Sequence, residues 1–338
     1  MKLNPRFVKH CSLLICIFLF LPCCGQKNAT KGTDVATFST NDIINNHKTP
    51  VFNADSAYTY IARQVAFGPR VPNTQAHLDC ADFLATELKR HGAQVFVQKA
   101  TLTAYNGENL NAQNIIGSFD PDKTRRVLLF AHWDTRPFAD EDANPANYRK
   151  PIDGADDGGS GVGVLLEIAR QIGNQRPEMG VDIIFFDAED YGTPKFEDGY
   201  NPDSWCLGSQ FWSKNPHIPN YKAEYGILLD MVGAKDATFF KEYTSVRYAS
   251  QYVEKVWETA RKLGYGKYFI NKAGGGIIDD HVPVNEVRRI PSLNIIHYSI
   301  DNNAGFGAHW HTMNDTMDII SKETLKAVGQ TVLTVIFN

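Results

Sequence analysis

The sequence has no run of basic residues and few cysteines, and each absence excludes a class of protein. The 338 residues carry a formal net charge of −4, and a chain without a basic patch is a poor match for nucleic acid. Of its six cysteines, only Cys80 and Cys206 lie beyond the first 24 residues. These two could pair in an oxidising compartment, but we expect buried free thiols. No disulfide framework holds the fold.

The first 24 residues have the pattern of an export signal. Lys2, Arg6 and Lys9 stand there without an acidic residue, and an apolar stretch follows over residues 12–21. This stretch is too short to span a bilayer comfortably. A cysteine at the expected cleavage point, within residues 22–25, resembles a bacterial lipoprotein signal. We therefore expect a periplasmic protein held on the membrane by a lipid. The alternative is an uncleaved anchoring helix.

The segment that follows is polar and low in aromatic residues. Residues 25–50 are rich in Thr, Asn and Lys, which is typical of a flexible tether. No internal repeat follows, so we expect residues 51–338 to form a single catalytic domain. Loss of the three basic residues of the leader would take the net charge to about −7.

Predicted strands alternate with predicted helices through this domain. The apolar periodicity and the capping residues predict helices at 55–66, 74–91, 161–172, from 209, 245–263 and 321–336. Short strands are expected at 94–102, 114–119, 127–131, 181–186, 226–231 and 292–297. Several of these strands are apolar on both faces. This order predicts an α/β fold whose mostly parallel sheet is covered by helices on each side.

Acidic residues and histidines recur where the predicted strands end. In such sheets ligands bind beyond the carboxyl ends of the strands. Buried carboxylates that lie together are costly unless a cation or hydrogen bonds compensate them. Oxygen ligands with an imidazole, and no cysteine among them, suit an open catalytic zinc site. The segments concerned are 132–134, 154–157, 189–190, Asp230, 279–281 after Ile277 and Ile278, and 310–312.

Each of these segments has an ordinary explanation when it is taken alone. The glycine-rich stretch 154–161 can be an acidic turn, and Glu189 with Asp190 can be a solvated loop. His311 can be a core histidine with satisfied hydrogen bonds. Asp230 inside an apolar stretch is costly without a partner. These separate explanations do not account for the joint occurrence of the segments in this order.

The order of these segments resembles that of the zinc exopeptidase clan over most of the chain beyond residue 55. Within the clan the sequence is similar to the glutaminyl-peptide cyclotransferases. Three short stretches carry this resemblance: Leu-Leu-Asp-Met-Val-Gly-Ala at 228–234, Ile-Asp-Asp-His-Val-Pro at 278–283, and Trp-His-Thr-Met at 310–313. Aminopeptidases of the clan tend to have Ser-Asp-His where this chain has Asp279-Asp280-His281. The resemblance implies a three-layer α/β/α fold.

The resemblance also implies a role for individual residues. One zinc ion per chain would be held by Asp157, Asp190 and His311. Position 190 is Asp where many relatives have Glu. Because the Asp side chain is shorter, the zinc ion would have to lie nearer the end of the strand predicted at 181–186. The other implied roles are Glu189 as general acid and base, Asp230 and Asp279 as a hydrogen-bonded acidic pair, and Trp310 and His132 as substrate contacts.

The implied reaction converts the N-terminal glutamine of a peptide or protein to pyroglutamate and releases ammonia. A two-zinc aminopeptidase remains an alternative, because its five expected ligands are all present: His132, Asp157, Asp190, Asp230 and His311. Asp279 is the residue that favours the cyclotransferase. A third possibility is a binding lipoprotein that kept a degenerate peptidase fold. Loss of a ligand would be its signature, and no ligand is lost.

Overall fold

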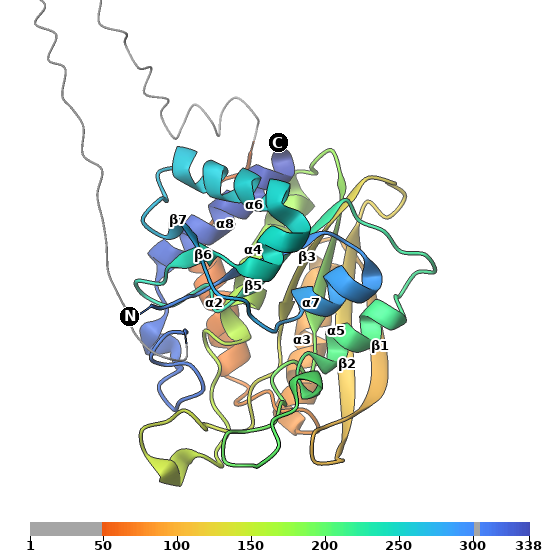
Figure 1. Cartoon of the computed structure of the whole chain (residues 1–338). Coiled ribbons are helices and arrows are strands. Elements are labelled where there is room, and N and C mark those ends of the chain that lie inside the picture. The colour runs from red at the N-terminus through yellow and green to blue at the C-terminus, as the bar shows by residue number, and fades with distance from the viewer. Residues whose placement is uncertain (1–48, 301–304) are drawn as a thin grey trace, which may run out of the picture. The chain divides into compact units, whose positions relative to one another are not determined.

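Six strands form the central sheet of the computed structural model, which describes residues 49–300 and 305–338 (Figure 1). Their order across the sheet is β1 (Gln94–Thr103), β2 (Asn109–Phe119), β4 (Gly180–Phe186), β3 (Arg126–His132), β5 (Tyr225–Asp230) and β8 (Ser292–Ile296). The last four run parallel, and β2 is antiparallel to both β1 and β4. The predicted mostly parallel sheet is confirmed, with two antiparallel pairings at the β1–β2 side.

Helices cover both faces of this sheet. One face packs against α2 (Ala54–Val65), α3 (Gln75–Arg90), α4 (Gly159–Asn174), α6 (Tyr243–Lys262) and α8 (Lys322–Phe337). The other face packs against α5 (Leu207–Lys214) and, after the short α7 (His281–Pro283), a π-helical segment at Val284–Arg288. The three-layer α/β/α architecture is thereby confirmed.

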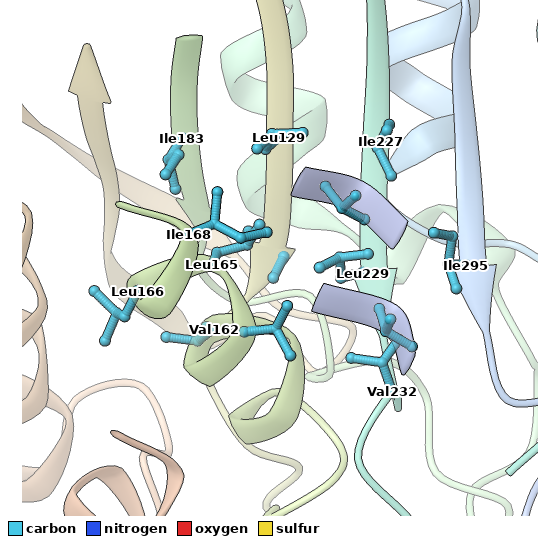
Figure 2. Close-up of a cluster of buried hydrophobic side chains, with 14 of the residues drawn as sticks. Leu129, Val162, Leu165, Leu166, Ile168, Ile183, Ile227, Leu229, Val232 and Ile295 are labelled. Atoms are coloured by element: carbon cyan, nitrogen blue, oxygen red, sulfur yellow. The ribbon is translucent and has the colours of Figure 1, made fainter. Parts of the chain in front are cut away.

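The apolar strands are explained by this double coverage. Along β3, Val127 and Leu129 pack against the helices of the first face, while Leu128 and Phe130 pack against the second face. Figure 2 shows the first of these cores, where Leu129 lies near residues of α4 such as Leu165. A strand that is buried on both faces needs apolar residues at every position.

Local signals set several helix ends. The Thr74 side chain accepts a hydrogen bond from the His77 backbone N–H, which caps α3 as predicted. Gly92 follows that helix with a φ of +85°, a left-handed conformation that glycine adopts without strain. Helix α2 is capped by Asn53, two residues before Asp55, where we expected the helix to begin.

One prediction about the strands was wrong, and two short strands were missed. Ile277 and Ile278 do not form a strand, so Asp279 reaches the site from a loop instead of a strand end. Strands β6 (Phe239–Lys241) and β7 (Phe269–Ala273) form a separate small sheet that was missed. Strand β2 also begins earlier than predicted, because residues 109–113 pair only with β1 and leave alternate polar side chains exposed.

The remaining expectations concern the cysteines and the leader. Cys80 and Cys206 are buried free thiols, as predicted. The predicted export signal and the tether up to residue 48 lie outside the described residues. Among residues 49–300 and 305–338, the structure contains no helix with the length and apolar character needed to cross a membrane.

Glu242 ties the loop that carries Asp279 to helix α6. Its carboxylate caps α6 by accepting hydrogen bonds from the Ser245 N–H and hydroxyl, at 2.6 and 2.7 Å. It also accepts from Ile277 N and faces His281 Nε2, both at 3.1 Å. Burial alone would raise the pKa of Glu242, but the bond to His281 and the backbone donors outweigh burial and lower it to about 2. The carboxylate thus fixes one wall of the site.

Replacing Glu242 by Gln should destabilise the protein in a pH-dependent manner. A carboxyl pKa lowered from 4.5 to about 2 corresponds to about 3 kcal/mol of folding free energy at neutral pH. This contribution is complete at pH values above the pKa that Glu242 has in the unfolded chain. It is lost as the pH falls through the pKa that Glu242 has in the folded protein. Urea unfolding should show a difference between the two proteins that is full at pH 7 and vanishes toward pH 2.

The control for this measurement is Glu258→Gln, which removes an exposed carboxylate from the same helix. It should change the unfolding free energy by no more than about 0.5 kcal/mol. A difference between wild type and Glu242→Gln that stays constant from pH 7 to pH 3 would contradict the assignment.

Candidate metal centre

The predicted site residues meet at the carboxyl ends of the parallel strands. His132 ends β3, Asp230 ends β5, and Glu189 follows β4. They border or lie behind a cavity of about 450 Å³. The site residues that line this cavity are Asp157, Glu189, Asp190, Asp230, Asp279, Trp310 and His311.

Asp157, Asp190 and His311 form a compact group of potential ligands. One donor atom of each lies within 4.8 Å of the other two. His311 Nε2 is 3.1 Å from Asp190 Oδ1 and 3.4 Å from Asp157 Oδ2. The side chains are almost fully buried, with exposed fractions of 3%, 1% and 3%. The shorter arm of Asp190 therefore still reaches the shared centre.

Unsatisfied oxygen atoms indicate that this group suits a cation. Asp157 Oδ2 and both carboxylate oxygens of Asp190 are buried without a hydrogen-bond partner. His311 and, at 3.5 Å from Asp190 Oδ1, Arg136 lie at ion-pair distance. Burial raises the pKa of Asp190, an effect that His311 opposes. Buried carboxylates without partners are costly, and two carboxylates with one imidazole are a donor set that zinc accepts. The residues present fit a zinc ion.

Two further carboxylates hold the backbone of the ligand loops. Asp315 accepts hydrogen bonds from the backbone N–H of Asp157 at 3.0 Å and of its neighbour at position 156 at 2.8 Å. Asp134 accepts from the N–H groups of Glu189 and Asp190, at 3.1 and 3.2 Å. Partners behind the ligands orient a metal site. Asp315 was missed, because nothing near it in the sequence marks it.

Left-handed backbone recurs beside the ligands. Ala188, Met231 and His311 have φ values of 51°, 48° and 52°. Such conformations are uncommon for residues other than glycine and cluster at functional sites. Gly158, with a φ of +85°, could not carry a side chain, because a Cβ there would lie 2.5 Å from the Asp134 carbonyl oxygen. The glycines before α4 thus permit a close approach of two loops.

His132 and Asp230 lie beside the proposed ligands. His132 Nε2 is 3.1 Å from Oδ1 of both Asp157 and Asp230, so all five ligands of the two-zinc alternative are close together. Burial raises the pKa of Asp230 to about 7, although its bond to His132 opposes this. His132 is 1% exposed and does not line the cavity. Its geometry therefore does not favour the substrate contact that we expected.

Glu189 and Asp279 face the same cavity from different loops. Burial raises the pKa of Glu189 well above its usual range; His132 opposes this, and the neighbouring acids add to it. Burial, followed by the charge of Asp230, raises the pKa of Asp279 to about 7. Asp279 accepts from Asn294 Nδ2 at 2.6 Å. In the described part of the chain it makes no direct hydrogen bond to Asp230, so the expected bonded pair is not observed.

Aromatic rings wall the cavity around His311. The Trp310 ring stacks on the His311 imidazole with centroids 3.8 Å apart, and Trp205 lies parallel to it at 6.0 Å. Trp205 and Tyr200 line the cavity but were missed. They lie in or beside the loop after Asp190, where no repeating pattern distinguishes a lining residue from an exposed one.

Asp156 fixes the loop that carries His311. His309 Nε2 lies 2.8 Å from Asp156 Oδ2, and His297 lies close to both. The Oδ1 atom of Asp156 accepts from the backbone N–H of Gly233 at 2.7 Å. The segments that carry Asp157, Asp230 and His311 are therefore tied together around the buried Asp156 carboxylate.

Comparison with known proteins agrees with this geometry. The model of peptidase family M28 matches residues 114–336, so the chain belongs to peptidase family M28. A glutaminyl cyclase from Tannerella forsythia is 70% identical with a TM-score of 0.85, covering 86% of this chain and 99% of that one. A Zn-dependent exopeptidase from Parabacteroides distasonis is 66% identical, with the same TM-score and coverage. The predicted resemblance to glutaminyl cyclases is confirmed.

A curated mammalian relative points to the same group. Glutaminyl-peptide cyclotransferase from Bos taurus is 27% identical over 241 residues, which are 63% of this chain. The match spans 62% of the bovine protein's own length.

Zinc added to metal-stripped protein should raise its thermal unfolding temperature, because a ligand that binds only the folded state stabilises it. His311→Ala should abolish most of this shift, since it removes the only imidazole of the three-residue group. The matched control is His217→Ala, which removes a histidine bonded to Trp212 outside the group. An equal zinc shift in wild type and His311→Ala would show that the ion binds elsewhere.

Proposed function

We propose that this protein is a glutaminyl-peptide cyclotransferase that carries one zinc ion per chain. It would act on peptides and proteins with N-terminal glutamine and release ammonia. The observation that carries this proposal is that Asp279 opens into the same cavity as Glu189 and the group of Asp157, Asp190 and His311. The likeness to a glutaminyl cyclase at 70% identity supports it.

The arrangement suits an intramolecular attack by the substrate's own α-amine. Zinc, when bound, would polarise the γ-amide carbonyl of the glutamine. The cavity walls, Trp310 among them, hold the flexible side chain in a ring-closing geometry. Glu189 has a raised pKa and a position in the cavity that suit it to take a proton from the amine and return it to the departing ammonia.

Asp230 and Asp279 complete the set of acids. The pKa of each is raised to about 7, mainly by burial. A carboxyl group with such a pKa can hold a proton near neutral pH and exchange it with its surroundings. We propose that these acids keep protons available to Glu189 and to the amine.

A difference between two groups of potential ligands supports one ion. The groups are Asp157, Asp190 and His311, and His132, Asp157 and Asp230. The unsatisfied oxygens belong to Asp157 and Asp190, whereas Asp230 already has a hydrogen bond with His132 at 3.1 Å. A second ion between His132, Asp157 and Asp230 would have to replace that bond. We therefore propose that a single zinc ion is held by Asp157, Asp190 and His311.

The two-zinc aminopeptidase is the second candidate. His132, Asp157 and Asp230 offer donor atoms within 4.8 Å of one another, which is the observation that favours it. In that case the purified protein would hold two ions and release free amino acids from peptides. Ion count and reaction product separate the two candidates.

We also propose export and a lipid anchor, so that the domain acts in the periplasm on the membrane surface. The support is the sequence alone: the basic start, the apolar stretch at residues 12–21 and the cysteines at 23 and 24. The segment at 25–50 would then be the tether.

Asp279→Asn tests the proposed reaction most sharply. Wild type should release ammonia from a Gln-initiated dipeptide and leave an amino-acid amide intact. The substitution should lower kcat by about 100-fold or more, because it removes a proton-handling carboxyl group from the cavity. Zinc content should stay at one ion per chain. The measurement is coupled detection of ammonia with metal analysis of the same samples.

Asp203→Asn is the control, since Asp203 is an exposed carboxylate on the neighbouring loop, and it should retain wild-type kcat. Hydrolysis of the amide, with two tightly held ions, would refute the cyclotransferase in favour of the aminopeptidase.

A further inference from the structure

Cys206 holds Glu189 at two points. Its backbone N–H donates to the Glu189 carbonyl oxygen at 2.9 Å. Its thiol donates to Glu189 Oε1, with 3.1 Å between sulfur and oxygen. Cys206 itself has a φ of 57°, in the left-handed region, at the residue that precedes helix α5. A conformation that is uncommon for a residue with a Cβ thus brings the thiol to the carboxylate.

The thiol is a fixed donor in this position. Cys206 is 2% exposed, and burial, followed by the charge of Glu189, raises the pKa of its thiol well above the usual value. The S–H proton is therefore retained, and a protonated thiol can donate to a carboxylate. The following turn fixes the residue from the other side, because Ser209 Oγ donates to the Cys206 carbonyl oxygen at 3.1 Å.

Glu189 has few other restraints. Its backbone N–H donates to Asp134 Oδ1 at 3.1 Å, and in the described part of the chain its carboxylate has no hydrogen bond besides the one from Cys206. The thiol therefore occupies Oε1 and leaves Oε2 for the cavity. A carboxylate held by one oxygen loses less rotational freedom when it takes a proton from a substrate.

We propose that Cys206 is a positioning residue that orients the Glu189 carboxylate toward the substrate amine. This inference rests on the proposed function, in which Glu189 transfers protons. In this role the sulfur atom neither binds the metal nor touches the substrate. A carboxylate oxygen of Asp279 also lies within 4.8 Å of the same thiol, so two acidic groups are close to the donor.

Cys80 provides a matched comparison inside the same chain. It is also a fully buried free thiol, but its thiol makes no hydrogen bond among the described residues. If Cys206 only filled space, truncation of either cysteine would affect stability and leave catalysis alone. If it orients Glu189, only its own truncation would affect catalysis.

The test uses the full-length protein and compares Cys206→Ala, Cys206→Ser and Cys80→Ala with wild type. Loss of the donor should lower kcat about tenfold with KM within about twofold, because the hydrogen bond to the Glu189 carboxyl group is lost while the cavity walls remain. The serine variant keeps a donor and should recover to within about threefold of wild type. The Cys80→Ala variant should keep wild-type kcat.

Wild-type kcat in Cys206→Ala would overturn the proposal. So would an equal kcat loss in the alanine and serine variants, or a loss of bound zinc from the alanine variant, since these indicate a packing or ligand role. Failure of the proposed function looks different: wild type itself would then release no ammonia from a Gln-initiated dipeptide.

Discussion

The structure depends on one electrostatic constraint, the burial of several carboxylates in a single cavity. Asp157 and Asp190 keep oxygens that no hydrogen bond satisfies, whereas most neighbouring acids have partners. Charges buried in this way persist only when an opposite charge compensates them. The Arg136 guanidinium, 3.5 Å from Asp190 Oδ1, supplies part of that compensation, and a zinc ion bound by this group would supply the rest. The same burial raises the pKa of Glu189 well above its usual value and that of Asp279 to about 7.

The fold brings these acids together through its backbone. Parallel strands end at one edge of the sheet, and left-handed residues such as Ala188 and Met231 turn the chain sharply where it leaves them. Asp134 and Asp315 then hold the ligand loops by their N–H groups. Glu242 fixes the remaining wall, which is a loop and not a strand end. The geometry of the site thus rests on backbone positions as much as on its ligands.

Sequence reasoning could predict what depends on local pattern. The strands that are apolar on both faces predicted the sheet, and the polar residues that follow them predicted the order of the ligands. The Trp310-His311 segment was identified because its order and neighbours resemble a known family. Reasoning failed where tertiary contacts decide: Asp315 and Cys206 carry no local signal, and Ile277 and Ile278 look like a strand but form a loop held by Glu242. Asp230 was expected to bond to Asp279, but in the structure it bonds to His132. Only tertiary packing decides between these two partners.

The most direct test of the central claim is to locate the metal by anomalous diffraction at the zinc absorption edge from crystals of the purified protein. A single peak bonded to Asp157, Asp190 and His311 is the expected result, with His132 still hydrogen-bonded to Asp230. A second peak of equal height between His132, Asp157 and Asp230, or a peak that avoids Asp190, would contradict the account.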